Sequence, residues 1–220
     1  MTYKVLLVDD HALVREGIAM LISREQDLTV CGEAEDAPKA LSLITQEAPD
    51  LVIVDLELKT SSGLDLIRQV RVMQPEVKIL VLSVHDERIY AERALRAGAR
   101  GFVMKSEVSQ KVMGAIRAIL EGKTAFSETV NDQLLLQRMG NHTGHGGSPA
   151  RMLSDRELQV FRLTGDGLTT HQIAQRLKVS RKTVYKHVER IKDKLHIRSS
   201  RELVRRAAQW VVDPNRKESP

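Results

Sequence analysis

The sequence predicts an α/β protein: a (βα)5 doubly wound parallel sheet followed by a small all-α domain. Three observations support this fold class. Short apolar runs alternate strictly with helix-like stretches over residues 1–125, a Gly-rich segment that also holds Ser, Pro and Asn follows at Gly140–Ala150, and only helix-like patterns come after it. Strict alternation of strands and helices is typical of a parallel sheet that is covered on both faces.

Each predicted strand is a short run of mostly apolar residues. The runs are Lys4–Val8, Leu28–Gly32, Leu51–Val54, Lys78–Ser83 and Gly101–Met104. Helix-like periodicity occupies the intervals and the stretch after the last run, at His11–Ser23, Ala37–Glu47, Gly63–Met73, Ile89–Ala97 and Ser109–Glu121. In such a sheet, ligands bind at the carboxyl ends of the strands.

Three carboxylates follow predicted strands. Asp9 and Asp10 follow the first strand, and Asp55 follows the third. The carboxyl ends of parallel strands meet at one edge, so we expect these side chains to share a crevice. Their repulsion would be costly unless a hard divalent cation bound among them, and Mg²⁺ prefers such oxygen ligands. We therefore expect an Mg²⁺ site, with the backbone carbonyl of Glu57 as a further ligand.

Two more polar residues stand at this edge, Ser83 in the fourth strand and Lys105 after the fifth. Phosphoryl transfer to a carboxylate needs a nucleophile and neutralisation of the phosphoryl oxygens. This chemistry makes Asp55 the nucleophile, with Mg²⁺ and Lys105 neutralising charge and the Ser83 hydroxyl binding phosphoryl oxygens. Singly, a strand-end Asp commonly caps a helix, and a lone Ser or Lys is commonly just solvated. The combination indicates phosphoryl transfer.

The motifs "VDDH", "VDLELKTSSG", "LSVH" and "AGARGFVMK" resemble the receiver domain of two-component response regulators over residues 3–123. The resemblance implies that a sensor histidine kinase phosphorylates Asp55. It also implies that Asp9 and Asp10 help to hold Mg²⁺. Ser83 and Phe102 would form the switch pair of such a domain, although Phe102 also fits a plain core aromatic.

One departure from the family pattern is Lys59, which stands where Pro is common, four residues after Asp55. Every residue with a chemical role is present, so we expect this change to alter the rate or lifetime of phosphorylation and not to abolish it.

Two other function classes are open. Mg²⁺-dependent phosphatases of the haloacid-dehalogenase type carry their nucleophile in a first-strand Asp-x-Asp pattern, which "VDDHALV" lacks. A regulator that works without phosphorylation would not need the complete acidic site.

Basic charge is concentrated in the C-terminal third. Residues 150–220 hold 17 Lys and Arg against 8 Asp and Glu, whereas residues 1–125 hold 16 against 19. This favours a nucleic-acid partner for the C-terminal domain, with a solvated basic surface as the alternative. Capping signals there predict a helix opened by "SDRE" at Ser154, a second at Thr170–Leu177, and a third, Arg181–Leu195, capped by Ser180.

The second and third of these helices, joined by the tight turn Lys178–Ser180, form a helix-turn-helix pattern. Residues 152–198 resemble the LuxR-type helix-turn-helix that ends NarL/FixJ-family regulators. The resemblance implies that the third helix enters the DNA major groove. The residues expected to contact DNA are Arg181, Lys182, Thr183, Tyr185, Lys186, Glu189, Arg190 and Lys192. For Glu189, an intrahelical ion pair with Lys186 or Lys192 has equal weight.

A last helix, from Ser199 or Ser200 to Val212, carries an apolar stripe of Leu203, Ala207 and Trp210. The stripe could complete the small core or pair with a second copy. In relatives the last helix serves dimerisation, so we predict that these three residues form the interface of a homodimer on DNA.

The expected domains are a receiver at 1–123, a linker with a short helix (Glu128–Met139) at 124–150, and the helix-turn-helix domain at 151–215. The expected partners are a sensor histidine kinase, double-stranded DNA and a second copy, with RNA polymerase as a further candidate. No run is long and apolar enough for a membrane span, so we predict a cytoplasmic protein. Because the acidic site is joined to a helix-turn-helix pattern, we predict a regulator and not an enzyme. Cys31, the single cysteine, is predicted to be a small buried residue.

Overall fold

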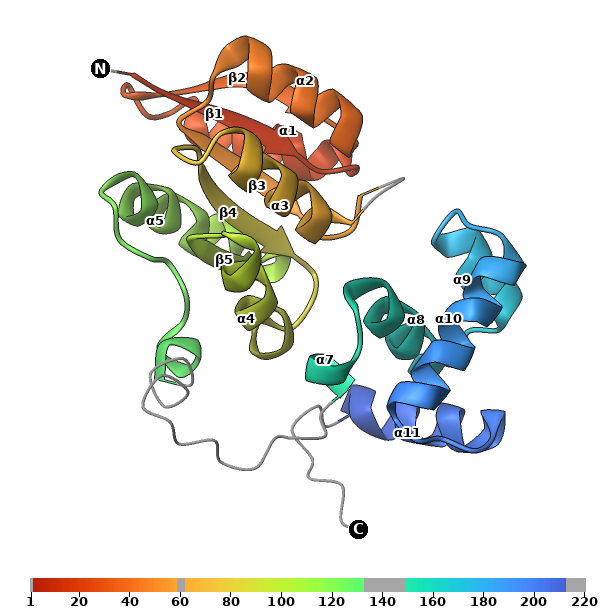
Figure 1. Cartoon of the computed structure of the whole chain (residues 1–220). Helices are drawn as coiled ribbons and strands as arrows, with labels where there is room; N and C mark the ends of the chain where they lie inside the picture. The colour runs from red at the N-terminus through yellow and green to blue at the C-terminus, as the bar shows by residue number, and fades with distance from the viewer. Residues whose placement is uncertain (1, 59–61, 133–148, 213–220) are drawn as a thin grey trace. The chain divides into compact units, whose positions relative to one another are not determined.

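The computed structural model describes residues 2–58, 62–132 and 149–212, and the chain divides into two compact units within residues 1–140 and 141–220 (Figure 1). The first unit contains a parallel five-stranded sheet in the order β2-β1-β3-β4-β5, which confirms the predicted fold class. Its strands are β1 (Tyr3–Val8), β2 (Leu28–Ala34), β3 (Leu51–Asp55), β4 (Lys78–Ser83) and β5 (Gly101–Met104).

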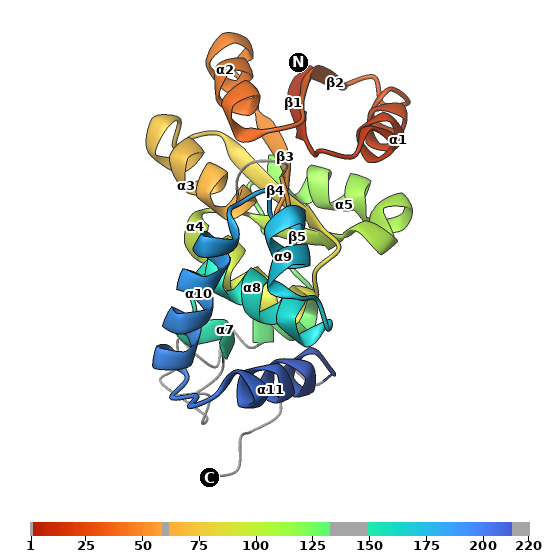
Figure 2. The ribbon, with the colours of Figure 1, turned by 90° about the vertical axis from the view of Figure 1, so that its right-hand side faces the viewer.

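Five helices cover the two faces of this sheet. They are α1 (Ala12–Ile22), α2 (Ala37–Glu47), α3 (Gly63–Met73), α4 (Glu87–Ala97) and α5 (Val108–Leu120). Figure 2 shows α2, α3 and α4 on one side of the sheet and α1 and α5 on the other. The element boundaries differ from the predicted ones by at most two residues. Strand β2 is longer than predicted because Glu33 and Ala34 continue its pairing with β1, beyond a register shift between Val5 and Leu6.

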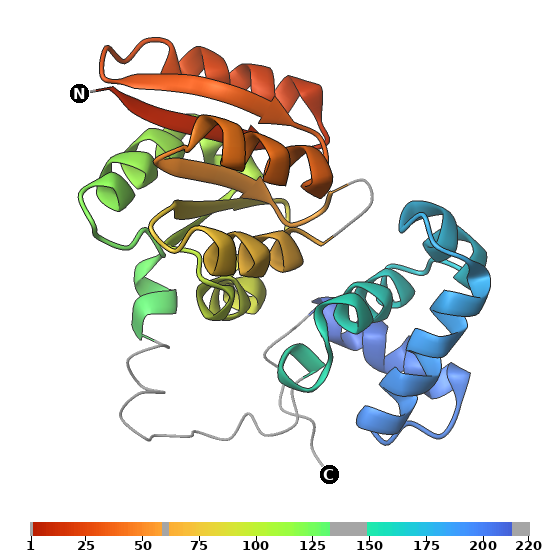
Figure 3. The ribbon, with the colours of Figure 1, turned by 45° about the horizontal axis from the view of Figure 1, so that its top comes forward.

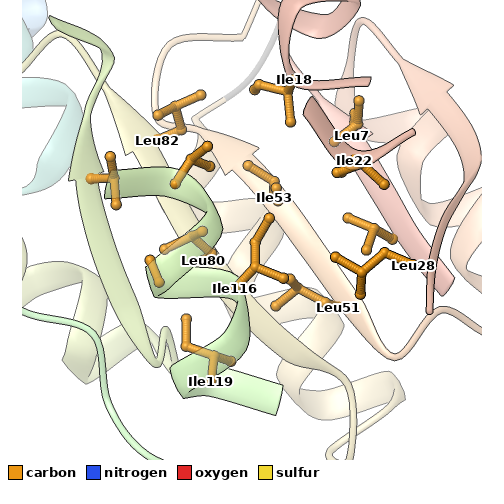
Figure 4. Close-up of a cluster of buried hydrophobic side chains, with 14 of the residues drawn as sticks. Leu7, Ile18, Ile22, Leu28, Leu51, Ile53, Leu80, Leu82, Ile116 and Ile119 are labelled. Carbon is orange, nitrogen blue, oxygen red and sulfur yellow. The ribbon is translucent and has the colours of Figure 1, made fainter. Parts of the chain in front are cut away.

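A buried apolar cluster joins the sheet to α1 and α5 (Figure 4). Its labelled members are Leu7, Ile18, Ile22, Leu28, Leu51, Ile53, Leu80, Leu82, Ile116 and Ile119. Burying a Leu or Ile side chain contributes about 1.5–3 kcal/mol. The cluster therefore fixes the strands rigidly, and with them the residues at their carboxyl ends. Cys31 on β2 is half-buried and not fully buried as predicted, and burial raises the pKa of its thiol.

The chain after α5 returns to the sheet. The backbone N–H of Phe102 donates to the carbonyl of Ala125 (2.9 Å), and the N–H of Ser127 donates to the Glu87 carboxylate (2.9 Å). A helical turn follows at residues 128–132, where Val130 is buried. The rest of the predicted linker helix, with its "QLLLQ" sequence, lies outside the described residues.

The described part of the second unit consists of helices (Figure 3). They are α7 (Pro149–Met152), α8 (Asp155–Gly165), α9 (Thr170–Arg176), α10 (Arg181–Lys194) and α11 (Ser200–Val212). The predicted capping box between Ser154 and Glu157 is present, and Ser180 accepts a hydrogen bond from the N–H of Thr183 at the start of α10. The tight turn before α10 places Lys178 at φ 51°, in the left-handed region.

Helix α11 completes the core of this second unit. Leu203, Ala207 and Trp210 are buried, and the Trp210 ring lies 5.7 Å from that of Phe161 on α8. Gly165 makes close helix packing possible, because a Cβ there would lie 2.4 Å from the carbonyl oxygen of Ala207. The prediction that this apolar stripe forms the dimer interface is therefore wrong, since its side chains are already covered within one copy.

One smaller difference concerns the end of α9. Leu177 was predicted to be its last helical residue, but it forms the C-cap of the helix and is half-buried. Across residues 2–58, 62–132 and 149–212, no helix combines the length and the apolar character needed to span a bilayer.

Candidate functional site

The carboxyl edge of the sheet brings the predicted acidic residues together. Asp9 follows β1 and is 3% exposed, and Asp55 ends β3 and is 2% exposed. Gly63, at the start of α3, packs directly on the backbone of Asp55, because a Cβ there would lie 2.1 Å from the Asp55 carbonyl oxygen. Any larger residue at position 63 would therefore displace the end of β3.

Lys105 joins the two buried carboxylates. Its Nζ lies 2.7 Å from Asp9 Oδ2 and 2.7 Å from Asp55 Oδ2, and its side chain is 10% exposed. The residue comes directly after β5, as predicted, and its stem reaches back across the edge of the sheet. One ammonium group therefore serves two carboxylates, which leaves an excess of negative charge at the site.

Asp10 and His11 form the more exposed side of the same site. His11 Nδ1 lies 2.8 Å from Asp10 Oδ1 and 3.1 Å from Asp9 Oδ1, while the backbone N–H of His11 donates to Asp9 Oδ1 at 2.8 Å. One ligand atom from each of Asp9, Asp10, His11 and Asp55 lies within 4.8 Å of the others. The predicted convergence of Asp9, Asp10 and Asp55 is thus observed, and His11 joins it unpredicted.

The protonation behaviour of the site follows from this crowding. Burial raises the pKa of Asp55 to about 6; Lys105 opposes the shift, and Asp9 adds to it. Burial lowers the pKa of Lys105, but the contacts with Asp55 and Asp9 outweigh it, so the pKa lies above its ordinary value. At neutral pH Asp55 is therefore mostly ionised but held at an energetic cost, beside a lysine that stays protonated.

The site has the chemistry of a hard-cation site. Two buried oxygens, Asp9 Oδ2 and Asp10 Oδ1, accept no hydrogen bond of good geometry from the described residues, although Lys105 Nζ and His11 Nδ1 lie 2.7 and 2.8 Å away. Carboxylate oxygens with free lone pairs are the ligands that Mg²⁺ prefers. The residues present therefore fit the predicted cation.

The predicted switch residues lie beside this edge. Ser83 ends β4 and is fully buried, and its Oγ accepts a hydrogen bond from the N–H of His85 at 3.1 Å. Phe102 pairs in register with Val81 and is 4% exposed, so its ring is already inside the fold. The predicted role of Phe102 as a core aromatic therefore fits, and its role in a switch stays a prediction.

Glu57, in the loop after β3, contacts His85 in the loop after β4, a residue that was not predicted to belong to the site. The backbone N–H of Glu57 donates to Asp55 Oδ1 at 3.2 Å, and its carboxylate lies 3.1 Å from His85 Nε2. The His85 ring stacks on Tyr90 with centroids 4.6 Å apart. No contact tests the carbonyl of Glu57 as a metal ligand, and Lys59 lies outside the described residues.

Helix α10 presents most of its predicted DNA contacts to solvent. The exposed ones are Arg181, Lys182, Tyr185, Lys186, Glu189 and Arg190. Thr183 is half-buried, with its hydroxyl 2.8 Å from Ser180 Oγ in the helix cap. Glu189 accepts a hydrogen bond from Lys192 at 2.8 Å, so the ion-pair interpretation is confirmed for Lys192, whose side chain is only 18% exposed.

An ion pair between a buried carboxylate and a lysine whose side chain is 42% exposed joins α10 to α8. Glu157 is 3% exposed and lies 2.7 Å from Lys194 Nζ, at the carboxyl end of α10, while also accepting a hydrogen bond from the N–H of Ser154 at 2.8 Å. Burial raises the pKa of Glu157, but Lys194 and Ser154 outweigh it and hold the pKa below its ordinary value. The contact ties the capping box of α8 to the exposed helix.

Both parts of the chain match known families. Residues 5–117 match the family described as "Response regulator receiver domain", and residues 151–207 match "Bacterial regulatory proteins, luxR family". The chain is 34% identical to the oxygen regulatory protein NreC of Staphylococcus carnosus over 206 residues, covering 91% of this chain and 94% of that protein. It is 37% identical to the transcriptional activator protein ExaE of Pseudomonas putida over 202 residues, covering 91% and 93%.

Among solved structures, the chain is similar to RcsB from Salmonella enterica serovar Typhimurium, bound to promoter rprA in the presence of phosphomimetic BeF3⁻. The TM-score is 0.64 at 25% identity, and the match covers 94% of this chain and 99% of that chain.

Proposed function

Because the chain belongs to the two-component response regulators that join a receiver domain to a luxR-family DNA-binding domain, we propose that phosphorylation of Asp55 controls its binding to DNA. The chain is a DNA-binding transcriptional regulator. The phosphoacceptor, the cation and the DNA-contacting residues are the proposed parts of this function.

The geometry and the family match together support the choice of Asp55. It is buried, mostly ionised at neutral pH because its pKa is about 6, and 2.7 Å from the ammonium of Lys105. Asp9 is equally close to Lys105, so the resemblance of the segment around Asp55 to a receiver domain decides between the two. Its carboxylate oxygen forms a bond to the phosphorus atom, and the bond from phosphorus to the imidazole nitrogen of a phosphorylated histidine kinase breaks. The kinase histidine leaves with the electron pair of that bond. Burial makes the carboxylate a better nucleophile because little water solvates it.

Asp9 and Asp10 would hold Mg²⁺ together with Asp55. When bound, the cation supplies positive charge that neutralises the phosphoryl oxygens during transfer. Lys105 contributes the second positive charge, since its Nζ already lies 2.7 Å from Asp55 Oδ2. Ser83, with its hydroxyl at the adjacent strand end, would donate to a phosphoryl oxygen.

Phosphorylation adds close to two negative charges at Asp55 and would draw Lys105 away from Asp9. A rearrangement of the Ser83 loop, and of Phe102 beside it in β5, would follow and alter the surface of α4, β5 and α5. The protein would exist in two conformational states, and phosphorylation would shift the equilibrium toward the one that dimerises and binds two inverted DNA half-sites. The unphosphorylated receiver would cover α10.

In the DNA complex, the exposed face of α10 would enter the major groove. Lys182, Lys186 and Arg190 are suited to phosphate contacts, which set affinity and salt dependence. Tyr185, which is 58% exposed, can reach a base edge or a phosphate. The structure with promoter DNA and a phosphomimetic, reported for RcsB, supports this proposal. We expect the protein to act in the cytoplasm, where its DNA target lies.

The test compares the full-length protein with Asp55→Asn in DNA binding. DNA fragments are first selected from a genomic library with protein treated with acetyl phosphate and Mg²⁺. Affinity for a selected fragment is then measured by fluorescence anisotropy before and after the same treatment. We expect phosphorylation to tighten binding about tenfold for the wild type, in line with usual coupling energies, and to leave Asp55→Asn unchanged.

Two results would overturn the proposal. Equal tightening for Asp55→Asn would remove Asp55 from the mechanism. Continuous turnover of acetyl phosphate or of another phosphate ester at enzymatic rates, in place of a stoichiometric modification, would favour a phosphatase.

A further inference from the structure

Arg15 on α1 holds the backbone of Asp9 from behind the acidic site. Its Nη1 donates to the Asp9 carbonyl oxygen at 2.6 Å, and its Nε donates to Glu33 Oε2 at 2.8 Å. The Arg15 side chain is 17% exposed, so both contacts are largely shielded from water. Neither the resemblance nor the predicted site includes Arg15 or Glu33.

These contacts attach both backbone polar groups of Asp9 to the end of β2. The N–H of Asp9 donates to the carbonyl of Ala34 at 3.1 Å, and the carbonyl of Asp9 is held through Arg15 to Glu33, the neighbouring residue on β2. The Ala34 contact holds the peptide plane between Val8 and Asp9, and the Arg15 contact holds the plane between Asp9 and Asp10. The orientation of that plane determines where Asp10 leaves the strand.

The orientation of Asp10 depends on this backbone constraint because few contacts fix its own side chain. Its side chain is 24% exposed and contacts His11 Nδ1, whose side chain is 63% exposed. A flexible surface contact of that kind fixes a carboxylate weakly. By contrast, Asp9 and Asp55 are buried against Lys105.

We propose that Arg15 is a positioning residue that, oriented by Glu33, pre-organises Asp9 and Asp10 as a pair of ligands for the divalent cation. This inference rests on the proposed Mg²⁺ site. The planar guanidinium can bond a carbonyl and a carboxylate at once, in a fixed fork, whereas a lysine ammonium is a point charge on a flexible stem. Partners that orient metal ligands typically contribute about 10- to 100-fold to metal affinity.

The positive charge of Arg15 makes the direction of the change in Mg²⁺ affinity informative. A positive group near a cation site repels the cation, so removing Arg15 would tighten Mg²⁺ binding if electrostatics alone mattered. Loss of positioning has the opposite effect and weakens binding. The direction of the change in Arg15→Ala therefore separates the two roles.

The experiment measures Mg²⁺ affinity of the full-length protein by isothermal titration calorimetry, with Arg15→Ala, Arg15→Lys and the wild type. Metal-free unfolding of each variant is recorded as a check on the fold. We expect the Mg²⁺ dissociation constant to rise about tenfold in Arg15→Ala. A smaller rise is expected in Arg15→Lys, which keeps the charge and loses the fork.

Arg117→Ala is the matched control. Arg117 on α5 also binds two carboxylates, donating to Asp27 and to Glu25 (2.6 Å), but these residues precede β2 at the opposite edge of the sheet. Removing it deletes a comparable arginine contact away from the acidic site. We expect its Mg²⁺ affinity to equal that of the wild type.

Phosphorylation kinetics give a second readout. With acetyl phosphate, we expect Arg15→Ala to need about tenfold more Mg²⁺ for half-maximal rate, and to approach the wild-type rate at saturating Mg²⁺. Unchanged or tighter Mg²⁺ binding in Arg15→Ala would overturn the inference, and so would wild-type affinity in Arg15→Lys if the alanine variant failed to fold. Absence of Mg²⁺ binding by the wild type would instead contradict the proposed cation site itself.

Discussion

Each unit of the molecule holds a buried carboxylate 2.7 Å from a lysine ammonium, with opposite consequences for the pKa of that carboxylate. Asp55 is 2% exposed and 2.7 Å from Lys105, while Glu157 is 3% exposed and 2.7 Å from Lys194. Yet the pKa of Asp55 is raised to about 6, whereas that of Glu157 lies below its ordinary value.

The difference lies first in how far each pair is withdrawn from water, since the Lys105 side chain is 10% exposed and that of Lys194 is 42% exposed, and then in what else each carboxylate contacts. Glu157 has its lysine to itself and also accepts a hydrogen bond from the Ser154 N–H, so its negative charge is well compensated. Asp55 shares Lys105 with Asp9, and burial raises its pKa by more than its contacts with Lys105 and the Glu57 N–H lower it. A carboxylate whose charge is compensated by its partners stabilises the fold. A group of carboxylates with excess negative charge is destabilising until a cation binds and neutralises it.

The largest expected effect of this contrast is a gain in stability from neutralising Asp55. A pKa raised by about two units corresponds to about 3 kcal/mol at neutral pH. We expect Asp55→Asn to raise the free energy of unfolding of the first unit by about that amount at pH 7.5 without Mg²⁺. Urea-dependent hydrogen exchange of peptides from β3 and β4, in the full-length protein, measures it.

The gain should depend on pH in a defined direction. Asp55 is protonated in both states below pH 4, and between pH 4 and 6 it keeps its proton only in the folded state. The wild type therefore loses stability relative to Asp55→Asn as pH rises from 4 to 6, and the gap is constant above that. A gap that stays equal from pH 4 to pH 8, measured in EDTA, would show that Asp55 has an ordinary pKa.

The same chemical change in the other unit should have the opposite sign. Glu157→Gln removes the charge that Lys194 compensates, and we expect it to lower the free energy of unfolding of the second unit by about 2 kcal/mol. The wild-type contribution is present above the ordinary pKa of Glu and is lost as pH falls through the lowered one. Fluorescence of Trp210, the single tryptophan, reports this unit because it is buried beside Phe161. A stabilised variant would remove the contrast.

The smallest expected effect is that of the cation itself. A ligand present at about ten times its dissociation constant stabilises the folded state by about 1.4 kcal/mol. We expect 10 mM Mg²⁺ to stabilise the first unit to roughly this extent and EDTA to reverse it, with no change in unfolding followed by Trp210. Equal stabilisation of both units would indicate a nonspecific ionic effect.

Much of this arrangement could be predicted from the sequence. Apolar runs and helical periods located the five strands and the helices α1 to α5 to within two residues, because burial dictates both patterns. The convergence of Asp9, Asp55 and Lys105 followed from topology alone, since the ends of parallel strands meet. Capping at Ser154 and Ser180 was equally visible, because a cap is a local interaction.

What escaped prediction depends on contacts between distant segments. His85 approaches Glu57 across two loops, and Arg15 on α1 bonds Glu33 on β2; neither pair has a local signature. His11 had one available signal, its place directly after two aspartates. The stripe on α11 was assigned to a dimer because periodicity shows that a face is apolar but not what covers it.

The most direct test of the central claim is to locate the phosphoryl group. Full-length protein treated with acetyl phosphate and Mg²⁺ is reduced with borohydride, which converts an aspartyl phosphate to homoserine, and its peptides are mapped by mass spectrometry. The account requires a single modification at Asp55 that disappears when EDTA replaces Mg²⁺. Modification at Asp9 or Asp10 in its place, or none at any of the three, would contradict it.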